Sequence, residues 1–270
     1  MPLPSQTRPG LLRQMNERSV MRVLQRHGPC SRADMTRRLG VTAPTVSKAV
    51  SSLLRGRLLE EFDSKQEGVG RPARQLRLAT ETAQVIGLVI DAHECHLVSA
   101  GLDGRILPES VCRFKTPRAY PALIEKVAQA VERIRATRSV TTLGLGISMP
   151  GLIDYRHQKG ILSPNVPITN GQSPARDLTE RLGVDCVMLQ ESHSLCLAQH
   201  HFGQSAGLDN FVMLDIGAGL GMGVMAGGRV LTGHSGLAGE IGHLIDAVKE
   251  WLSAMRWQHF VWQQDIVRTP

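Results

Sequence analysis

The chain has 270 residues, of which 42% are hydrophobic and 20% charged, and its net charge is +7. This length is enough for one large domain with a sizeable core and a second, smaller domain. No apolar run reaches the roughly 18 residues that a membrane-spanning helix needs, and residues 1–10 lack the apolar segment of a signal peptide. The composition therefore predicts a cytoplasmic globular protein and argues against a membrane or secreted one.

The cysteines support a reducing compartment. They are odd in number and form no Cys-x-x-Cys pair: Cys30, Cys95, Cys112, Cys186 and Cys196. We expect buried or incidental thiols rather than a disulfide framework or an all-cysteine zinc site.

The charge is distributed unevenly. Residues 1–79 hold 15 Lys and Arg against 6 Asp and Glu, a net +9, whereas residues 80–270 hold 16 against 18, a net −2. A small domain with this excess is attracted to a polyphosphate and gains free energy by releasing its counterions. A merely solvated basic surface is the alternative.

The N-terminal pattern predicts a helix pair joined by a tight turn. Apolar residues three and four apart predict one or two helices over residues 11–27. Ser31 can cap the next helix, with Asp34 three residues on, and Gly40 ends it. Thr42 can cap a third helix, whose first turn tolerates Pro44.

The start of this third helix has side chains suited to the major groove, where hydroxyls meet base edges and methyls meet thymine. The predicted DNA-contacting residues are Thr42, Ala43, Thr45, Ser47 and Lys48. A helix pair with a glycine turn also occurs in bundles that bind no DNA.

A predicted hairpin follows, with apolar runs at 58–62 and 75–78 around residues 63–74. Its tip contains Gly70-Arg71-Pro72, a narrow loop that can place the Arg71 guanidinium in a minor groove. Helix pair, wing and charge together predict a winged helix-turn-helix over residues 1–79 that binds double-stranded DNA.

From Ala83 onward, short apolar runs alternate with helical stretches. The runs at 85–90, 143–147, 186–189 and 211–216 predict buried strands, and 120–136 predicts a helix. This alternation indicates an α/β domain.

Glycine-rich and polar motifs follow some of these strands: Gly144 to Asp154, Ser163 to Pro167, Asp215 to Gly223, and Gly239-Glu240-Ile241-Gly242-His243. Alternate glycines let a backbone approach an anion or another strand closely. Taken singly each motif is weak, since turns and structural histidines are commoner than ligand sites.

In their order, these motifs resemble the ROK family, which contains bacterial sugar kinases and NagC/XylR-type repressors; the N-terminal unit is similar to the repressor branch. The resemblance implies an actin-like (ribonuclease H-like) two-lobed fold with a sugar or sugar phosphate held between the lobes. Carried onto this chain, it implies that the sugar contacts are Asn165, Glu191, Glu240 and His243. Purely structural turn and cap roles for these residues are the alternative.

Two departures from the family argue against catalysis. Asp91-Ala92-His93-Glu94-Cys95 stands where the kinases have an Asp-x-Gly-Gly-Thr phosphate loop, and Ser192 stands where they have the catalytic Asp. A serine hydroxyl is no base near neutral pH, and phosphoryl transfer needs a positioned donor. We therefore predict no enzymatic activity and no cofactor.

The end of the chain also departs from the family. Residues 244–270 contain no cysteine, whereas the family continues with a cysteine-rich zinc element and the rest of the second lobe. His243 alone cannot form a four-ligand site, so zinc is predicted absent. We expect a partial ROK domain over 80–246 and, at 247–270, an aberrant tail that arose by truncation or a frameshift.

The sequence thus predicts a transcriptional regulator of carbohydrate metabolism genes, a repressor controlled by a sugar or sugar phosphate, with a homodimer compatible with this plan. A constitutive or defective DNA-binding fragment is the alternative, and a sugar kinase a weaker one.

Overall fold

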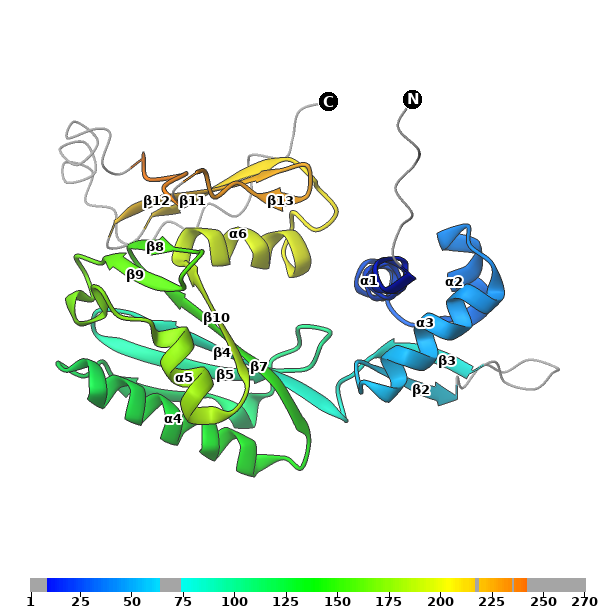
Figure 1. Cartoon of the computed structure of the whole chain (residues 1–270), viewed down its shortest axis with the longest axis horizontal. Coiled ribbons are helices and arrows are strands. Elements are labelled where there is room, and N and C mark those ends of the chain that lie inside the picture. Colours follow the sequence, from blue (N-terminus) through cyan, green and yellow to red (C-terminus); the bar gives the residue numbers. More distant parts are fainter. Residues whose placement is uncertain (1–8, 64–73, 217–218, 235, 242–270) are drawn as a thin grey trace.

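The computed structural model describes residues 9–63, 74–216, 219–234 and 236–241. An N-terminal winged helix (residues 9–79) adjoins an α/β unit, which consists of a main sheet and a small sheet (Figure 1). This arrangement confirms the predicted fold class. Among the described residues, no helix is long and apolar enough to cross a membrane.

The winged helix contains three helices packed against a three-stranded antiparallel sheet of order β1-β3-β2. Its elements are α1 (Pro9–His27), β1 (Cys30–Ser31), α2 (Arg32–Leu39), α3 (Ala43–Arg55), β2 (Leu59–Asp63) and β3 (Arg74–Leu78). Their shared core is a cluster of fully buried aliphatic side chains that includes Val20, Met35, Val50 and Leu76. The N-terminal unit therefore has a hydrophobic core of its own.

The turn between α2 and α3 confirms the predicted signals. Ser31 and Asp34 form a reciprocal capping box at the start of α2, which satisfies amide groups that have no partner within the helix. Gly40 ends α2 with φ 63°, a left-handed conformation that favours glycine. Thr42 is the N-cap of α3 in position, but its side chain makes no capping hydrogen bond.

The main sheet has the order β10-β7-β4-β5-β6. Strands β4, β7 and β10 are parallel, while β5 and β6 are antiparallel additions. The strands are β4 (Ala83–Ile90), β5 (Glu94–Ala100), β6 (Cys112–Lys115), β7 (Thr141–Met149) and β10 (Asp185–Gln190). Helices α4 (Tyr120–Thr137) and α5 (Pro174–Leu182) lie together on one face (Figure 1). Their apolar sides and the sheet form the larger core.

A small hairpin, β8 (Leu152–Asp154) and β9 (Lys159–Leu162), follows β7, and short 3-10 turns occur at η1 (Pro108–Ser110) and η2 (Pro167–Thr169). Gly151 between β7 and β8 has φ 96°, and a Cβ there would lie 2.7 Å from the Cα of Ser163. The glycine therefore lets the chain reverse against the loop that follows β9.

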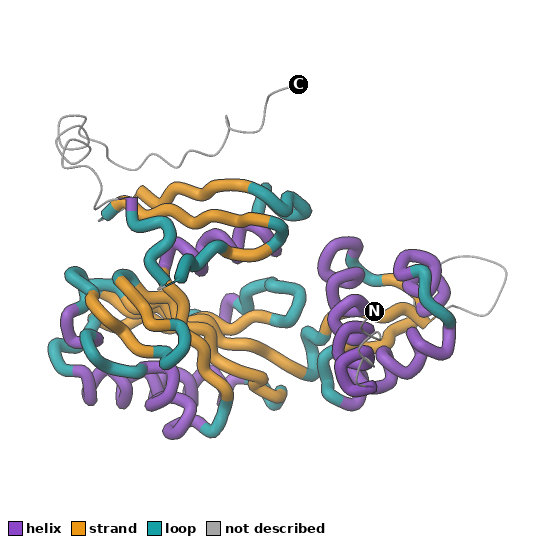
Figure 2. The backbone as a smooth tube through the Cα atoms, turned by 45° about the horizontal axis from the view of Figure 1, so that its top comes forward, coloured by secondary structure: helices purple, strands orange, loops and turns teal. Residues whose placement is uncertain are grey.

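The small sheet contains β11 (Phe211–Ile216), β12 (Leu220–Ala226) and β13 (Arg229–Val230). Helix α6 (Glu191–Phe202) lies between it and the main sheet (Figure 2). A Cβ on Gly223 of β12 would lie 2.6 Å from the Cβ of Cys196, so glycine is what allows α6 to lie this close. On the opposite face, Val212, Leu214 and Ile216 are exposed.

A buried carboxylate fixes the junction between the winged helix and the main sheet. One oxygen of Glu60 accepts hydrogen bonds from the amides of Thr80, Glu81 and Thr82 at 3.0, 2.8 and 2.8 Å. The other accepts from Arg77 Nε at 2.9 Å. Burial raises the pKa of Glu60, but the hydrogen bonds outweigh this effect and lower it overall. The connection is therefore a defined structure and not a loose linker.

Candidate functional site

Helix α3 presents the predicted DNA-contacting residues on its outer side. Thr42, Ala43 and Lys48 are exposed, whereas Thr45 and Ser47 are half-buried. The hydroxyls of Thr42 and Thr45 lie 2.9 Å apart and share a hydrogen bond. The inward side of α3 is fixed by buried Val46, Ala49, Val50 and Leu53. This helix therefore offers hydroxyls, a methyl and an ammonium group from a rigid base.

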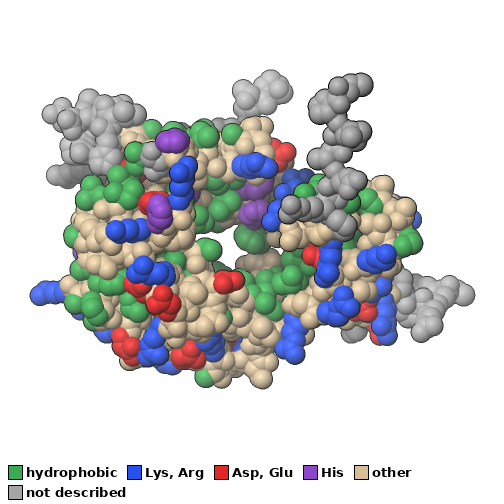
Figure 3. Space-filling model, viewed as in Figure 1, with side chains coloured by type: hydrophobic (Ala, Val, Ile, Leu, Met, Phe, Trp, Pro, Cys, Tyr) green, Lys and Arg blue, Asp and Glu red, His purple; other side chains and the backbone are tan. Residues whose placement is uncertain are grey.

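Basic side chains stand around α3 on the surface of the winged helix (Figure 3). Several are paired: Arg37 with Asp34, and Arg32 and Arg74 with Glu61 at 2.6 and 3.2 Å. Lys48 and Arg38 make no ion pair with another described residue. Arg71, the predicted minor-groove residue, lies outside the described residues.

A second site lies where the parallel strands of the main sheet end. Asp91 follows β4 directly, and Glu191 follows β10 as the first residue of α6. Because β4, β7 and β10 run parallel, their carboxyl ends share one edge of the sheet, where α/β proteins commonly bind ligands. Burial raises the pKa of Glu191, and Asp215 and Asp91 raise it further. Asp91 and Asp215 therefore lie near enough to Glu191 to act on its pKa.

Two buried polar atoms in this region have no hydrogen-bond partner among the described protein atoms: Ser192 Oγ and Gln190 Oε1. Ser192 lies beneath Gly221, since a Cβ on that glycine would be 3.3 Å from the Cβ of Ser192 and 3.7 Å from that of Asp215. Because Gly221 and Gly223 have no side chains, the backbone of β12 can lie close to α6. Unpaired buried polar atoms are costly and point to a further partner.

A hydrogen-bonded chain joins the turn after β8, helix α6 and the segment that carries Glu240. The Tyr155 hydroxyl lies 2.5 Å from His193 Nδ1, and His193 Nε2 lies 3.2 Å from the carbonyl oxygen of Ala238. A carbonyl only accepts, so Nε2 carries the proton, Nδ1 accepts, and Tyr155 donates to it. Burial lowers the pKa of His193, which keeps the ring neutral.

Glu240 is held in place through the same region, because Gln190 donates its side-chain amide to the Glu240 carboxylate. Gln190 also donates its backbone N–H to the Tyr155 hydroxyl at 3.1 Å. The pKa of Tyr155 is raised to about 12, chiefly by burial. The Gln190 N–H lowers this pKa, and the charge of Glu240 raises it. The arrangement brings Glu240 beside the residue that precedes Glu191.

The other two predicted sugar contacts are not brought into this cluster by any observed contact. Asn165 is exposed on the loop between β9 and η2, and its side chain makes no hydrogen bond to another described residue. His243 lies outside the described residues. The region therefore joins two of the four predicted residues, Glu191 and Glu240, through Gln190.

The sequence interpretation missed Tyr155, Gln190 and His193 as parts of the site. Tyr155 and His193 are 38 residues apart, and only the fold brings them together. Gln190 had a signal, since it immediately precedes Glu191, a predicted sugar contact. Within the described part of the chain, no three His, Cys, Asp or Glu residues group as a metal site would require.

Comparison with known proteins agrees with this architecture. Residues 85–252 match the model of the ROK family, and residues 10–71 match that of the MarR family. The DNA-binding transcriptional dual regulator NagC of Escherichia coli K12 is 27% identical over 240 residues, 87% of this chain and 58% of NagC. The xylose repressor of Caldicellulosiruptor bescii is 24% identical, covering 86% of this chain and 59% of the repressor.

Solved structures show the same fold. A ROK family transcriptional regulator, a homologue of the E. coli MLC protein, superposes with a TM-score of 0.69 at 22% identity, covering 84% of this chain and 58% of that one. Sugar kinases of the family share the fold. The chain spans about three fifths of the length of the curated relatives it matches. With more than half of its residues matched by the family model, the chain belongs to the ROK family.

Proposed function

We propose that this protein is a DNA-binding transcriptional repressor of carbohydrate genes whose operator affinity is set by a sugar or sugar phosphate. The observation that carries the proposal is the joining, in one chain, of a basic winged helix with an exposed α3 to a sheet edge beside which Glu191 and Glu240 lie. The names of the matched relatives, a transcriptional regulator and a xylose repressor, support it.

In the DNA-binding half, residues 1–79, α3 enters the major groove and the wing approaches the minor groove. Thr42, Ala43, Thr45, Ser47 and Lys48 make the major-groove contacts, and Arg71 the minor-groove contact. The net charge of +9 on residues 1–79 supports phosphate binding. A homodimer places two such units on an inverted repeat.

In the ligand-binding half, residues 80–246, Asn165, Glu191, Glu240 and His243 hydrogen-bond the hydroxyl groups of the effector. The unpartnered Ser192 Oγ and Gln190 Oε1 support a polar ligand at this edge. Residues 247–270 take no assigned part. The effector acts because it binds one arrangement of the lobes more tightly than the other.

The protein regulates and does not phosphorylate. Ser192, at the position of the family's catalytic Asp, is buried beneath Gly221, and Asp91 to His93 form the short turn between β4 and β5 in place of a phosphate loop. A coupled assay of ATP consumption with hexoses and amino sugars tests this. If the wild-type protein consumes ATP in this assay and the Glu191→Gln variant does not, the protein is a kinase instead.

The DNA half is tested by selecting binding sites from a random duplex pool with the full chain, followed by gel-shift titration of the recovered sequence. The proposal expects a preferred sequence with A·T-rich flanks where the wing lies. Equal affinity for the selected and the random duplex at moderate salt would refute it.

The ligand half is tested by thermal unfolding with xylose, N-acetylglucosamine, glucose and glucose 6-phosphate. A formed site raises the unfolding midpoint as the concentration of a binding sugar increases. Glu240→Ala should remove that rise without changing operator affinity. A chain that binds the operator but responds to no sugar would instead be a constitutive DNA-binding fragment.

A further inference from the structure

Helix α6 connects the two halves of the protein. Its first turn contains Glu191, Ser192 and His193 at the carboxyl edge of the main sheet, and its C-terminal end is turned toward the winged helix (Figure 1). Burial lowers the pKa of His201, and His200, Arg22 and Arg26 lower it further, which places the end of α6 near α1. One helix of 12 residues therefore runs from the proposed sugar site to the side of the winged helix on which α1 lies.

This helix is fixed to the small sheet. Gly223 of β12 packs directly on Cys196, the His200 ring stacks on Phe211 with centroids 6.4 Å apart, and His200 Nδ1 lies 3.0 Å from the carbonyl of Leu208. These contacts lie on the middle and the end of α6. Any shift of the small sheet therefore carries α6 with it.

The loop between β5 and η1 belongs instead to the winged-helix side. Leu102 donates its N–H to the carbonyl of Ala79 at 2.9 Å, and its side chain packs against the hydrophobic core of the winged helix. Gly104 in this loop has φ 80° and lies directly against the Phe202 ring. The contact of Phe202 with Gly104 is thus a contact between the α6 unit and a loop anchored to the winged helix.

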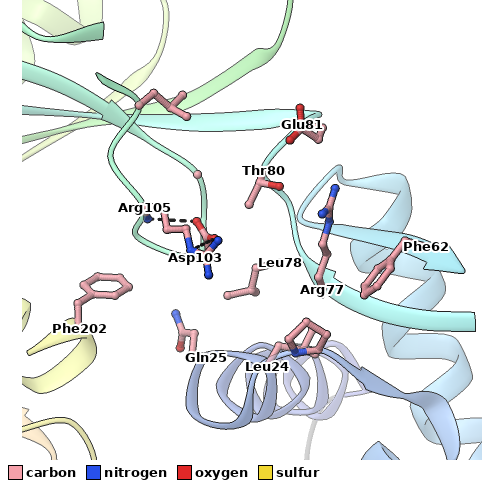
Figure 4. A pocket seen from close by; sticks show the side chains of 14 residues that line it. Leu24, Gln25, Phe62, Arg77, Leu78, Thr80, Glu81, Asp103, Arg105 and Phe202 are labelled. Atoms are coloured by element: carbon pink, nitrogen blue, oxygen red, sulfur yellow. Dashed lines mark hydrogen bonds and ion pairs between the residues drawn. The ribbon is translucent and has the colours of Figure 1, made fainter. Parts of the chain in front are cut away.

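The space around this contact is not close-packed. A cavity of about 510 Å³ lies between the winged helix and the end of α6. Phe202 faces it from one side, opposite Gln25, Leu78 and Arg77 (Figure 4). Phe202 is 58% exposed. Among the described residues, one ion pair joins α1 to the segment between α6 and β11: Arg26 lies 3.6 Å from Asp209, and both side chains are exposed. An interface between α6 and the winged helix with this much free volume can change its geometry without compressing a core.

We propose that α6 is the element that transmits effector binding to the DNA-binding unit, with Phe202 as the residue through which it acts. The inference rests on the proposed function and names the regulation of that same site. A sugar held by Glu191 at the start of α6 favours one position of α6 and the small sheet. Phe202 then bears differently on Gly104, and the winged helix changes its orientation.

The test compares Phe202→Ala with a matched control, Leu195→Ala, in the full chain. Leu195 is also an exposed apolar residue of α6, at 40%, but does not line the cavity. Fluorescence anisotropy on the selected operator gives the operator Kd with and without xylose, N-acetylglucosamine, glucose or glucose 6-phosphate. Calorimetry gives the Kd of the responding sugar with and without the operator, because coupling must be reciprocal.

Allosteric coupling between two sites is typically about 5- to 150-fold in affinity. We expect Phe202→Ala to bring the ratio of the Kd values measured with and without the other ligand close to one, in both measurements. The sugar Kd and the operator Kd measured alone should stay within about twofold of wild type, because Phe202 is not among the proposed contacts of either ligand. Leu195→Ala should retain the wild-type ratio. Asp209→Asn, which removes the ion pair with Arg26, should lower it partially.

The outcomes separate the two proposals. A wild-type chain whose operator affinity no sugar changes overturns the proposed function, and this inference with it. A wild-type chain that responds, together with a Phe202→Ala variant that responds equally, overturns the role of α6 alone. An equal loss in Leu195→Ala would show that the helix as a whole, and not Phe202, sets the ratio, which also contradicts the proposal.

Discussion

Single side chains set the properties of both halves, and Glu60 is the clearest case. Its carboxylate is 9% exposed and is surrounded by donors from residues 77 and 80–82. Glu60→Gln places an amide donor among these donors. We expect a loss of about 1–3 kcal/mol in the free energy of unfolding, measured by urea denaturation at pH 7. Glu61→Gln, whose partners are exposed arginines, should cost less.

The same residue predicts a pH dependence. Because the pKa of Glu60 is lowered in the folded state, its stabilisation is complete above the unfolded value of about 4.3 and is lost as the pH falls toward the folded pKa. The stability difference between wild type and Glu60→Gln should therefore narrow on acidification. A constant difference between pH 7 and pH 3.5 would show that the charge of Glu60 is not what matters.

Lys48 offers a second test at the residue scale. Lys48→Ala should weaken operator binding by about 1–3 kcal/mol if Lys48 contacts a base, and otherwise weaken all duplexes alike with a smaller dependence on salt. Arg55→Ala removes a charge from the other end of α3 and serves as the control. Unchanged affinity in Lys48→Ala would contradict the proposed docking of α3.

At the scale of elements, the packing of α6 on β12 depends on one missing methyl group. Gly223→Ala would set a Cβ 2.6 Å from both the Cβ of Cys196 and the carbonyl oxygen of Ser192. We expect a loss of about 1–3 kcal/mol from overpacking, seen as a lower unfolding midpoint. Gly146→Ala, also in a strand, has nothing within 4 Å and should be close to neutral. Equal midpoints for the two variants would contradict the observed contact.

The elements also show what the sequence can and cannot predict. The continuous apolar runs at 85–90, 143–147, 186–189 and 211–216 became β4, β7, β10 and β11. The prediction that all four are buried was wrong for β11, in which no residue is buried. Strand β5 and helices α5 and α6 were not predicted. Their apolar residues are mixed with histidine, serine and arginine, and long-range packing decides their structure.

The candidate site, like the fold, was predicted from the sequence only in part. Glu191 and Glu240 were implied by the family resemblance, and in the structure Gln190, the neighbour of Glu191, donates a hydrogen bond to Glu240. The pairing of Tyr155 with His193 had no local signal, since neither spacing nor composition says which residues two separate elements bring together. The resemblance pointed to Glu191 and Glu240 but not to the residues that hold them in place.

At the scale of the whole molecule, the separation of charge predicts how DNA binding depends on salt. If the net +9 of residues 1–79 engages six phosphates, affinity should fall about 10³-fold between 50 and 200 mM salt. The slope of log Kd against log salt, measured on random duplex, gives the number of contacts. An affinity that salt leaves unchanged would exclude phosphate binding as its source.

The anchoring of Glu60 has a practical meaning for anyone who cuts the chain. A fragment that stops at Ala79 lacks all three backbone amides that donate hydrogen bonds to the Glu60 carboxylate. It also lacks the Thr82 hydroxyl, which donates to the same oxygen at 2.9 Å. Such a fragment would keep a nearly buried anion with a single arginine beside it. A DNA-binding fragment intended for separate study should therefore extend at least through Thr82.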